Sequence, residues 1–125
     1  EIGETGGMGP CIGVILYDPV TKYAIMGHFV DPRVNDFVGM ISKAKSFFKN
    51  ISAVRVFVGG GAPDACDSPY CDPEGDKEIR NFVQNNLQEA GFRNPKIEYL
   101  NSNQSTVMSI DTRTGKVVFD TLEDD

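Results

Sequence analysis

The sequence contains no tryptophan, a single histidine and only three cysteines among its 125 residues. Three cysteines are too few for a disulfide framework, and one histidine leaves no evident set of zinc ligands, so we expect no metal site. We expect no organic cofactor either. No apolar run approaches the roughly 20 residues of a spanning helix, which predicts no membrane insertion. Lys and Arg total 12 against 18 Asp and Glu, and this net charge of −6 argues against nucleic acid as a partner.

The length of 125 residues predicts a single domain over 1–125, because a chain of this size buries one core. The chain starts with Glu1 rather than Met, which indicates that a preceding segment has been removed.

Apolar periodicity predicts an α/β (α+β) layered sandwich in which mixed sheet pairing accompanies two main helices. Short apolar runs bounded by turn residues predict strands at 12–17, 23–29, 53–58, 96–100, 105–110 and 116–120. Apolar residues at helical spacing predict helices over 33–49 and near 76–90. The inward residues are expected to be Val34, Phe37, Val38, Ile41, Ala44 and Phe48 in the first helix, and Ile79, Phe82, Val83, Leu87 and Ala90 in the second.

The only histidine and the first cysteine fall on the first two predicted strands. A four-residue turn over 18–21 would pair Tyr17 with Lys22, and the same register would set Cys11 directly opposite His28. Direct cross-strand neighbours lie about 5 Å apart at Cβ, whereas a shift of one residue would put them on opposite faces. This register therefore predicts a thiol–imidazole pair.

A thiol beside an imidazole is a candidate nucleophile, because the neighbouring imidazolium favours the reactive thiolate. The imidazole can then return a proton to a departing amine. Glycines around Gly7 and Gly9 leave backbone N–H groups open for an oxyanion hole. On the pattern alone, the alternative is a structural cysteine that packs as a small hydrophobe.

The segment Thr5-x-Gly7-x-Gly9-x-Cys11, an apolar strand ending in Tyr17-Asp18, and His28 seventeen residues after Cys11 together resemble the chemoreceptor glutamine deamidase family, CheD. Gly59-Gly60-Gly61-Ala62 and the closing turn 111–115 are also similar to segments of that family. The resemblance implies a fold related to the catalytic domain of cytotoxic necrotizing factor.

The resemblance further implies a Cys11–His28–Thr5 triad. Cys11 would be the nucleophile, His28 the general base and acid, and Thr5 the group that orients the imidazole. The implied reaction is hydrolysis of a protein glutamine side chain to glutamate through an acyl-thioester. The implied substrate is a chemoreceptor, the implied partner is a CheC-type phosphatase, and the implied location is the cytoplasm.

The chain departs from the family pattern at several places. Pro10 stands where the family commonly has Ser, and it removes one backbone N–H beside the nucleophile, so the oxyanion hole is expected to be arranged differently. Only four residues precede Thr5, so the family's N-terminal strand is expected to be nearly absent. The segment 64–72 also differs from the family.

Two rival functions stay open. One is a secreted effector-type deamidase or transglutaminase on the same scaffold. A Cys66–Cys71 disulfide would favour this rival, because it would indicate an oxidising compartment, whereas the alternative is two free thiols in the cytosol. The other is a catalytically idle CheD-like binding module.

The acidic residues Asp64, Asp67, Asp72, Glu74 and Asp76 match no calcium-loop spacing, which favours a solvated loop over a cation site.

Overall fold

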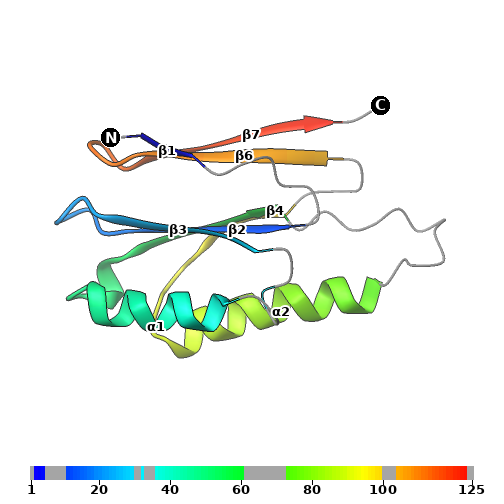
Figure 1. Ribbon diagram of the computed structural model, residues 1–125, viewed down its shortest axis with the longest axis horizontal. Helices are drawn as coiled ribbons and strands as arrows, with labels where there is room; N and C mark the ends of the chain where they lie inside the picture. The colour runs from blue at the N-terminus through cyan, green and yellow to red at the C-terminus, as the bar shows by residue number, and fades with distance from the viewer. Residues whose placement is uncertain are drawn as a thin grey trace.

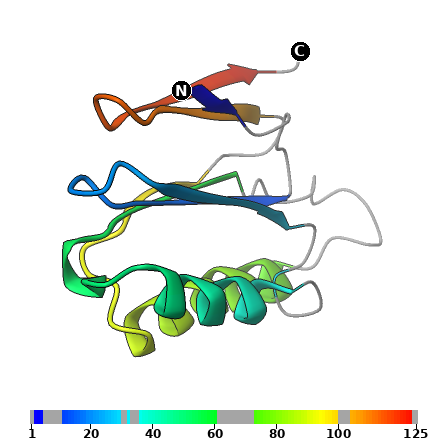
Figure 2. The ribbon, with the colours of Figure 1, turned by 60° about the vertical axis from the view of Figure 1, so that its left-hand side comes forward.

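The computed structural model describes residues 2–4, 11–29, 32, 36–60, 73–99 and 104–123. They form a layered α+β structure in which a four-stranded sheet lies between a pair of helices and a three-stranded sheet (Figures 1 and 2). The expected layered architecture with two helices and mixed strand pairing is therefore confirmed.

The central sheet has the strand order β3-β2-β4-β5. Its strands are β2 (Ile12–Tyr17), β3 (Ala24–Phe29), β4 (Arg55–Gly60) and β5 (Lys96–Tyr99). The β2–β3 and β2–β4 pairs are antiparallel, whereas β4 and β5 are parallel. A parallel pair needs a long crossover, and α2 (Pro73–Glu89) supplies it between β4 and β5.

The hairpin of β2 and β3 has a different register from the predicted one. Tyr17 pairs with Ala24 rather than with Lys22. The backbone N–H of Asp18 donates to the carbonyl of Tyr23 at 2.9 Å, so the four-residue loop is 19–22 and not 18–21. The Asp18 carboxylate accepts from the N–H of Val20 at 2.9 Å, and Lys22 takes a left-handed φ of 63°, which together start and close the turn one residue later.

The second sheet has the order β1-β6-β7 and is antiparallel throughout. It consists of β1 (Ile2–Glu4), β6 (Gln104–Asp111) and β7 (Lys116–Glu123). The sequence predicted β6 and β7 but almost no strand ahead of residue 5, and the three residues of β1 are enough to pair with β6. The two sheets stack face to face, with β6 and β7 connected by the expected turn.

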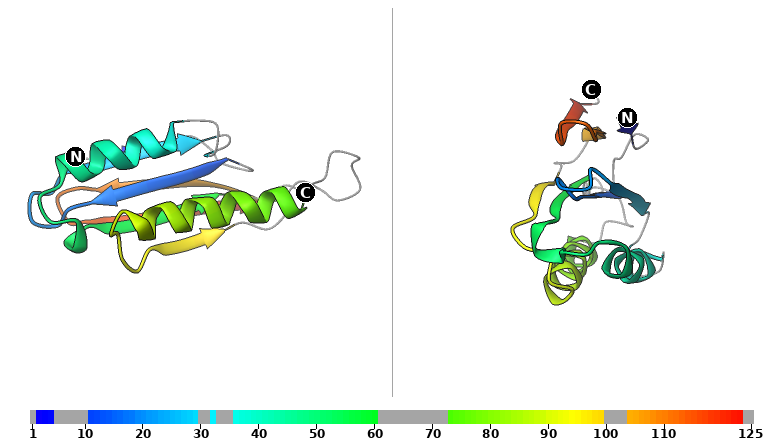
Figure 3. Two further views of the ribbon diagram at one scale, coloured as in Figure 1. Left: turned by 90° about the horizontal axis from the view of Figure 1, so that it is seen from below. Right: turned by 90° about the vertical axis from the view of Figure 1, so that its left-hand side faces the viewer.

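The two helices lie side by side on the other face of the central sheet (Figure 3). The first, α1 (Phe37–Phe47), starts later than the predicted residue 33. Asp36 is its N-cap, and the carboxylate accepts from the N–H of Gly39 at 3.1 Å. The prediction that Val38 faces inward is wrong, because Val38 is 50% exposed and Met40 takes the place in the core. A short 3-10 turn, η1 (Ile51–Ala53), then leads into β4.

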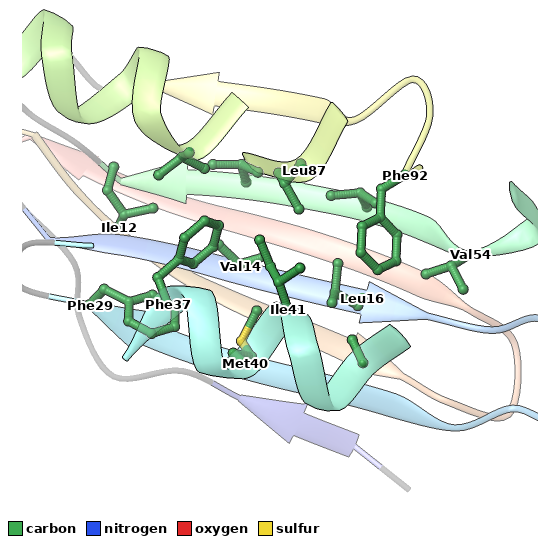
Figure 4. Packing of buried hydrophobic residues seen from close by; sticks show 14 of the residues in the cluster. Ile12, Val14, Leu16, Phe29, Phe37, Met40, Ile41, Val54, Leu87 and Phe92 are labelled. Atoms are coloured by element: carbon green, nitrogen blue, oxygen red, sulfur yellow. The ribbon is translucent and has the colours of Figure 1, made fainter. Parts of the chain in front are cut away.

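Two separate cores hold the layers together. The larger one lies between the helices and the central sheet and contains Ile12, Val14 and Leu16 from β2, with Phe37, Ile41, Leu87 and Phe92 among their partners (Figure 4). The smaller one lies between the two sheets and is built around Ile15, Tyr17, Met108 and Ile110. Strand β2 is buried on both faces, which explains why its sequence is a continuous apolar run.

Candidate active site

Cys11 and His28 are not directly opposite each other, so the predicted pairing is wrong. His28 pairs with Gly13, and Cys11 lies two residues before Gly13, immediately ahead of β2. The register differs from the predicted one by two residues. Strand alternation places Gly13 on the face of His28, but it does not extend to Cys11, which is in a bend ahead of β2. Cys11 thus lies two residues along the chain from the cross-strand partner of His28.

The face of the hairpin that carries His28 and Gly13 is the one that faces the second sheet. In β2, Ile15 and Tyr17 pack into the core between the sheets, and Gly13 continues the same alternation. In β3, Ala24 and Met26 pack there, and His28 continues that series. The imidazole thus belongs to one end of the space between the two sheets, and Cys11 precedes the strand that starts at the same end.

Glycine occupies the positions beside His28 on this face. Gly13 pairs with His28 on β3 and with Gly59 on β4. A glycine inside a strand leaves room above the backbone, so no side chain of β2 stands between the imidazole and position 11. At Gly59 the room is taken by the second sheet, because a Cβ there would lie 2.8 Å from Phe119 Cε1 and 3.0 Å from Met108 Sδ.

The side chains of Cys11 and His28 are both at least partly exposed to solvent. Cys11 is a free, partly exposed thiol, and His28 is exposed although its neighbour Phe29 is buried. The site thus lies at the outer end of the sheets, where β2 begins and β3 ends.

The remaining predicted site residues, Thr5, Gly7, Gly9 and Pro10, lie outside the described residues. The candidate disulfide between Cys66 and Cys71 and the acidic residues 64–72 also lie outside the described residues.

One electrostatic feature lies near this end of the central sheet. Tyr99 pairs with Gly60, which in turn pairs with Ile12 at the start of β2. The Arg80 guanidinium lies 4.5 Å from the centre of the Tyr99 ring. Burial raises the pKa of Tyr99 above its ordinary value, and the charge of Arg80 partly offsets that effect. The Tyr99 phenol is therefore neutral at physiological pH.

No group of three or more metal-binding side chains occurs in the part of the chain that the structure describes. A hollow of about 850 Å³ lies by the end of α2, lined by Gln84, Asn85, Gln88 and residues 91–95. Among the described helices, none has the length and apolar character to cross a membrane.

Sequence reasoning did not identify the two strand glycines, Gly13 and Gly59, as part of this region. An isolated glycine inside an apolar strand was the available signal, because it marks a close approach of a ligand or another chain segment. Gly59 has that role for the second sheet, and Gly13 is the direct neighbour of His28. No protein-family model matches the chain, and no curated protein matches it either.

Proposed function

We propose that this protein is a cysteine-dependent amidohydrolase that converts glutamine side chains of a protein substrate to glutamate. Cys11 is the nucleophile, His28 is the general base and acid, and Thr5 orients the imidazole. The observation that carries the proposal is that Cys11, directly ahead of β2, lies two residues from Gly13, the cross-strand partner of His28. The CheD-like fold and the triad come from the sequence resemblance.

The chemistry proceeds in two half-reactions. The Cys11 thiol gives its proton to His28, and the sulfur attacks the side-chain amide carbon of glutamine. The tetrahedral intermediate collapses when His28 donates that proton to the amide nitrogen, so that the C–N bond breaks, ammonia leaves and an acyl-thioester remains on Cys11. Water then attacks the thioester while His28 takes its proton. The C–S bond breaks, glutamate is released, and His28 returns the proton to the Cys11 sulfur.

Geometry and exposure support these roles. Diagonal neighbours on adjacent strands lie roughly 7–8 Å apart, and the proposal requires the thiol and the imidazole to turn toward each other across a separation of this order. Cys11 is partly exposed and His28 is exposed, and deamidation of a protein substrate requires exposed catalytic groups. The negatively charged carbonyl oxygen of the intermediate needs N–H donors, and the glycine-rich segment ahead of Cys11 is the candidate source.

The proposed substrate is the helical cytoplasmic region of a chemoreceptor, and the proposed regulatory partner is a CheC-type phosphatase. Both follow from the resemblance to the deamidase family. They also place the protein in the cytoplasm and in chemotaxis.

The test is a deamidation assay on chemoreceptor fragments, read by mass spectrometry as glutamine-to-glutamate conversion. We expect conversion by the wild-type protein and none by Cys11→Ser or His28→Gln. Cys66→Ser and Cys71→Ser are matched thiol controls and should retain activity. Circular dichroism of each variant establishes that loss of activity is not loss of fold.

Alkylation of Cys11 by iodoacetamide provides a readout that does not need the natural substrate. If His28 activates the thiol, His28→Gln should slow this reaction at neutral pH while Cys66→Ser leaves it unchanged. Conversion that persists in Cys11→Ser would refute the nucleophile. A wild-type protein that binds receptor or phosphatase but converts no glutamine, with Cys11 equally reactive in His28→Gln, would instead establish an idle binding module.

A further inference from the structure

The basic side chains of this acidic protein are concentrated at one end of the fold. This end, which we call the turn end, comprises the turns 18–23 and 111–116, the C-terminal half of α1 with η1, the first residue of β4, and the loop 90–96 (Figures 1 and 3). It is opposite the end that holds Cys11 and His28, because β2 runs from Ile12 to Tyr17 between them. Its exposed basic side chains are Lys22, Lys43, Lys45, Lys49, Arg55, Arg93, Lys96, Arg113 and Lys116.

Contacts between elements place these turns together. The ring centroids of Tyr23 and Phe47 are 5.6 Å apart, which joins the β2–β3 turn to the end of α1. The Tyr17 hydroxyl donates to the carbonyl of Thr112, which joins β2 to the β6–β7 turn. Phe92 packs in the same core as Val54, which brings the loop after α2 to this end as well.

Acidic side chains are few among the described residues of the turn end: Asp18 and Asp111 lie in its turns, and the exposed Glu89 ends α2 next to the loop 90–96. Asp18 is 5% exposed and accepts a hydrogen bond from Val20, and Asp111 forms an ion pair with Arg113. Between residues 37 and 63 the sequence has no Asp or Glu at all. Although the net charge of the chain is −6, the turn end is therefore positively charged, and the remainder of the chain is strongly acidic.

Exposed apolar side chains lie among these positive charges. Val20 is 81% exposed at the tip of the β2–β3 turn, Tyr23 is 59% exposed, and Phe47 is 52% exposed. Lys22 precedes Tyr23 in the turn, and Lys43 lies one helical turn before Phe47. Apolar and aromatic tips surrounded by lysines are typical of surfaces that rest in the headgroup region of an anionic bilayer.

We propose that the turn end is a peripheral binding surface for an anionic lipid bilayer. The positive charges are spread over all layers of the fold, which matches an extended planar anionic surface. Lysine is depleted in protein–protein interfaces, which makes an acidic protein the weaker candidate. The phosphates of a nucleic acid would bind the lysines, but they would gain nothing from the exposed aliphatic side chain of Val20. Bound in this way, the protein points Cys11 and His28 away from the lipid.

Sedimentation with large unilamellar vesicles tests this proposal, and it is independent of the deamidase activity. We expect the full chain to bind vesicles of phosphatidylcholine with phosphatidylglycerol, but not vesicles of phosphatidylcholine alone. Binding should weaken as salt rises from about 0.05 M to about 0.5 M, because the charges are at the surface. Each lysine neutralised in Lys22→Gln and Lys49→Gln should weaken binding about fivefold.

Two matched controls separate the surface from general effects. Lys77→Gln removes an exposed lysine on α2, away from the turn end, and should bind like the wild type. Val20→Asp should lose binding, whereas Val118→Asp, at a 43% exposed position on β7, should lose much less. Neither Val20 nor Val118 is in a core, so both variants are expected to fold.

Several outcomes would overturn the proposal. They are absence of binding to anionic vesicles at low salt, equal binding to neutral vesicles, and equal loss in Lys77→Gln. Binding of double-stranded DNA or of an acidic protein at least as tight as binding to lipid, with no effect of Val20→Asp, would identify a different polyanionic partner. That result would also overturn the lipid assignment.

Discussion

Tyr17 and Thr112 join the two sheets of this protein, since the Tyr17 hydroxyl donates a hydrogen bond of 2.6 Å to the Thr112 carbonyl oxygen. Tyr17 is 2% exposed in β2, and Thr112 lies in the turn between β6 and β7. Gly115 in the same turn has a φ of 77°, and a Cβ there would lie 2.7 Å from Tyr17 Cε2. The turn is therefore shaped around the tyrosine ring.

Tyr17→Phe should lower the free energy of unfolding by about 1 kcal/mol, because it leaves the Thr112 carbonyl without its donor while the ring stays in place. Urea denaturation with an unchanged m-value measures this loss. Tyr23→Phe is the matched control, because Tyr23 is 59% exposed and its change should be within about 0.5 kcal/mol. Equal losses in both variants would contradict the prediction.

Gly59→Ala should destabilise the contact between the two sheets by roughly 1–3 kcal/mol, since the new methyl group meets Phe119 and Met108. The same substitution in a Phe119→Leu background should cost less, because the smaller side chain leaves room. A double-mutant cycle of thermal or urea unfolding measures this coupling. Additive losses would show that the crowding at Phe119 is not the cause.

Asp36→Ala should destabilise the protein by about 1 kcal/mol, because the N–H of Gly39 loses its acceptor at the start of α1. Asp36→Ser should retain most of the stability, since a serine hydroxyl can accept the same hydrogen bond. Comparison of the two variants by urea denaturation tests the capping role. If both lose the same amount, the carboxylate has another role.

The Asp111 carboxyl should titrate below its ordinary pKa of 3.8, because it accepts hydrogen bonds from the Arg113 side chain and backbone N–H. A pKa lowered in the folded state adds stability above pH 3.8, and that stability is lost as the pH falls through the folded-state pKa. Carboxyl NMR measures the titration. Arg113→Ala should move the Asp111 pKa back toward its ordinary value, and an unchanged titration would exclude the pairing.

Most elements could be predicted from the sequence because local patterns encode them. The apolar run 12–17 is β2 residue for residue, and the expected inward residues Val83 and Leu87 of α2 are fully buried. The turn 111–115 also forms as predicted, with the N–H of Gly115 donating to the Asp111 carbonyl at 2.7 Å. β1 was missed because three residues carry too little pattern, and it forms only by pairing with β6.

The cross-strand partner of His28 depends on the position of the β2–β3 turn, and apolar periodicity does not determine that position. Turn residues between Asp18 and Tyr23 allow a four-residue loop at more than one place, and each place sets a different partner for His28. The Asp18 carboxylate on the N–H of Val20 and the left-handed Lys22 select loop 19–22. Thus His28 pairs with Gly13, and Cys11 is two residues away from the predicted position opposite the imidazole.

By itself the sequence determined six of the seven described strands, the two helices, and the candidate thiol and imidazole, because period-two and helical apolar patterns and rare residues are properties of the chain. Tertiary structure decided how the strands divide into two sheets and which residue faces His28. It also gathered lysines from separate turns at one end, although the net charge is −6. Such relationships join residues far apart in the sequence, and only the packing of layers against one another brings those residues together.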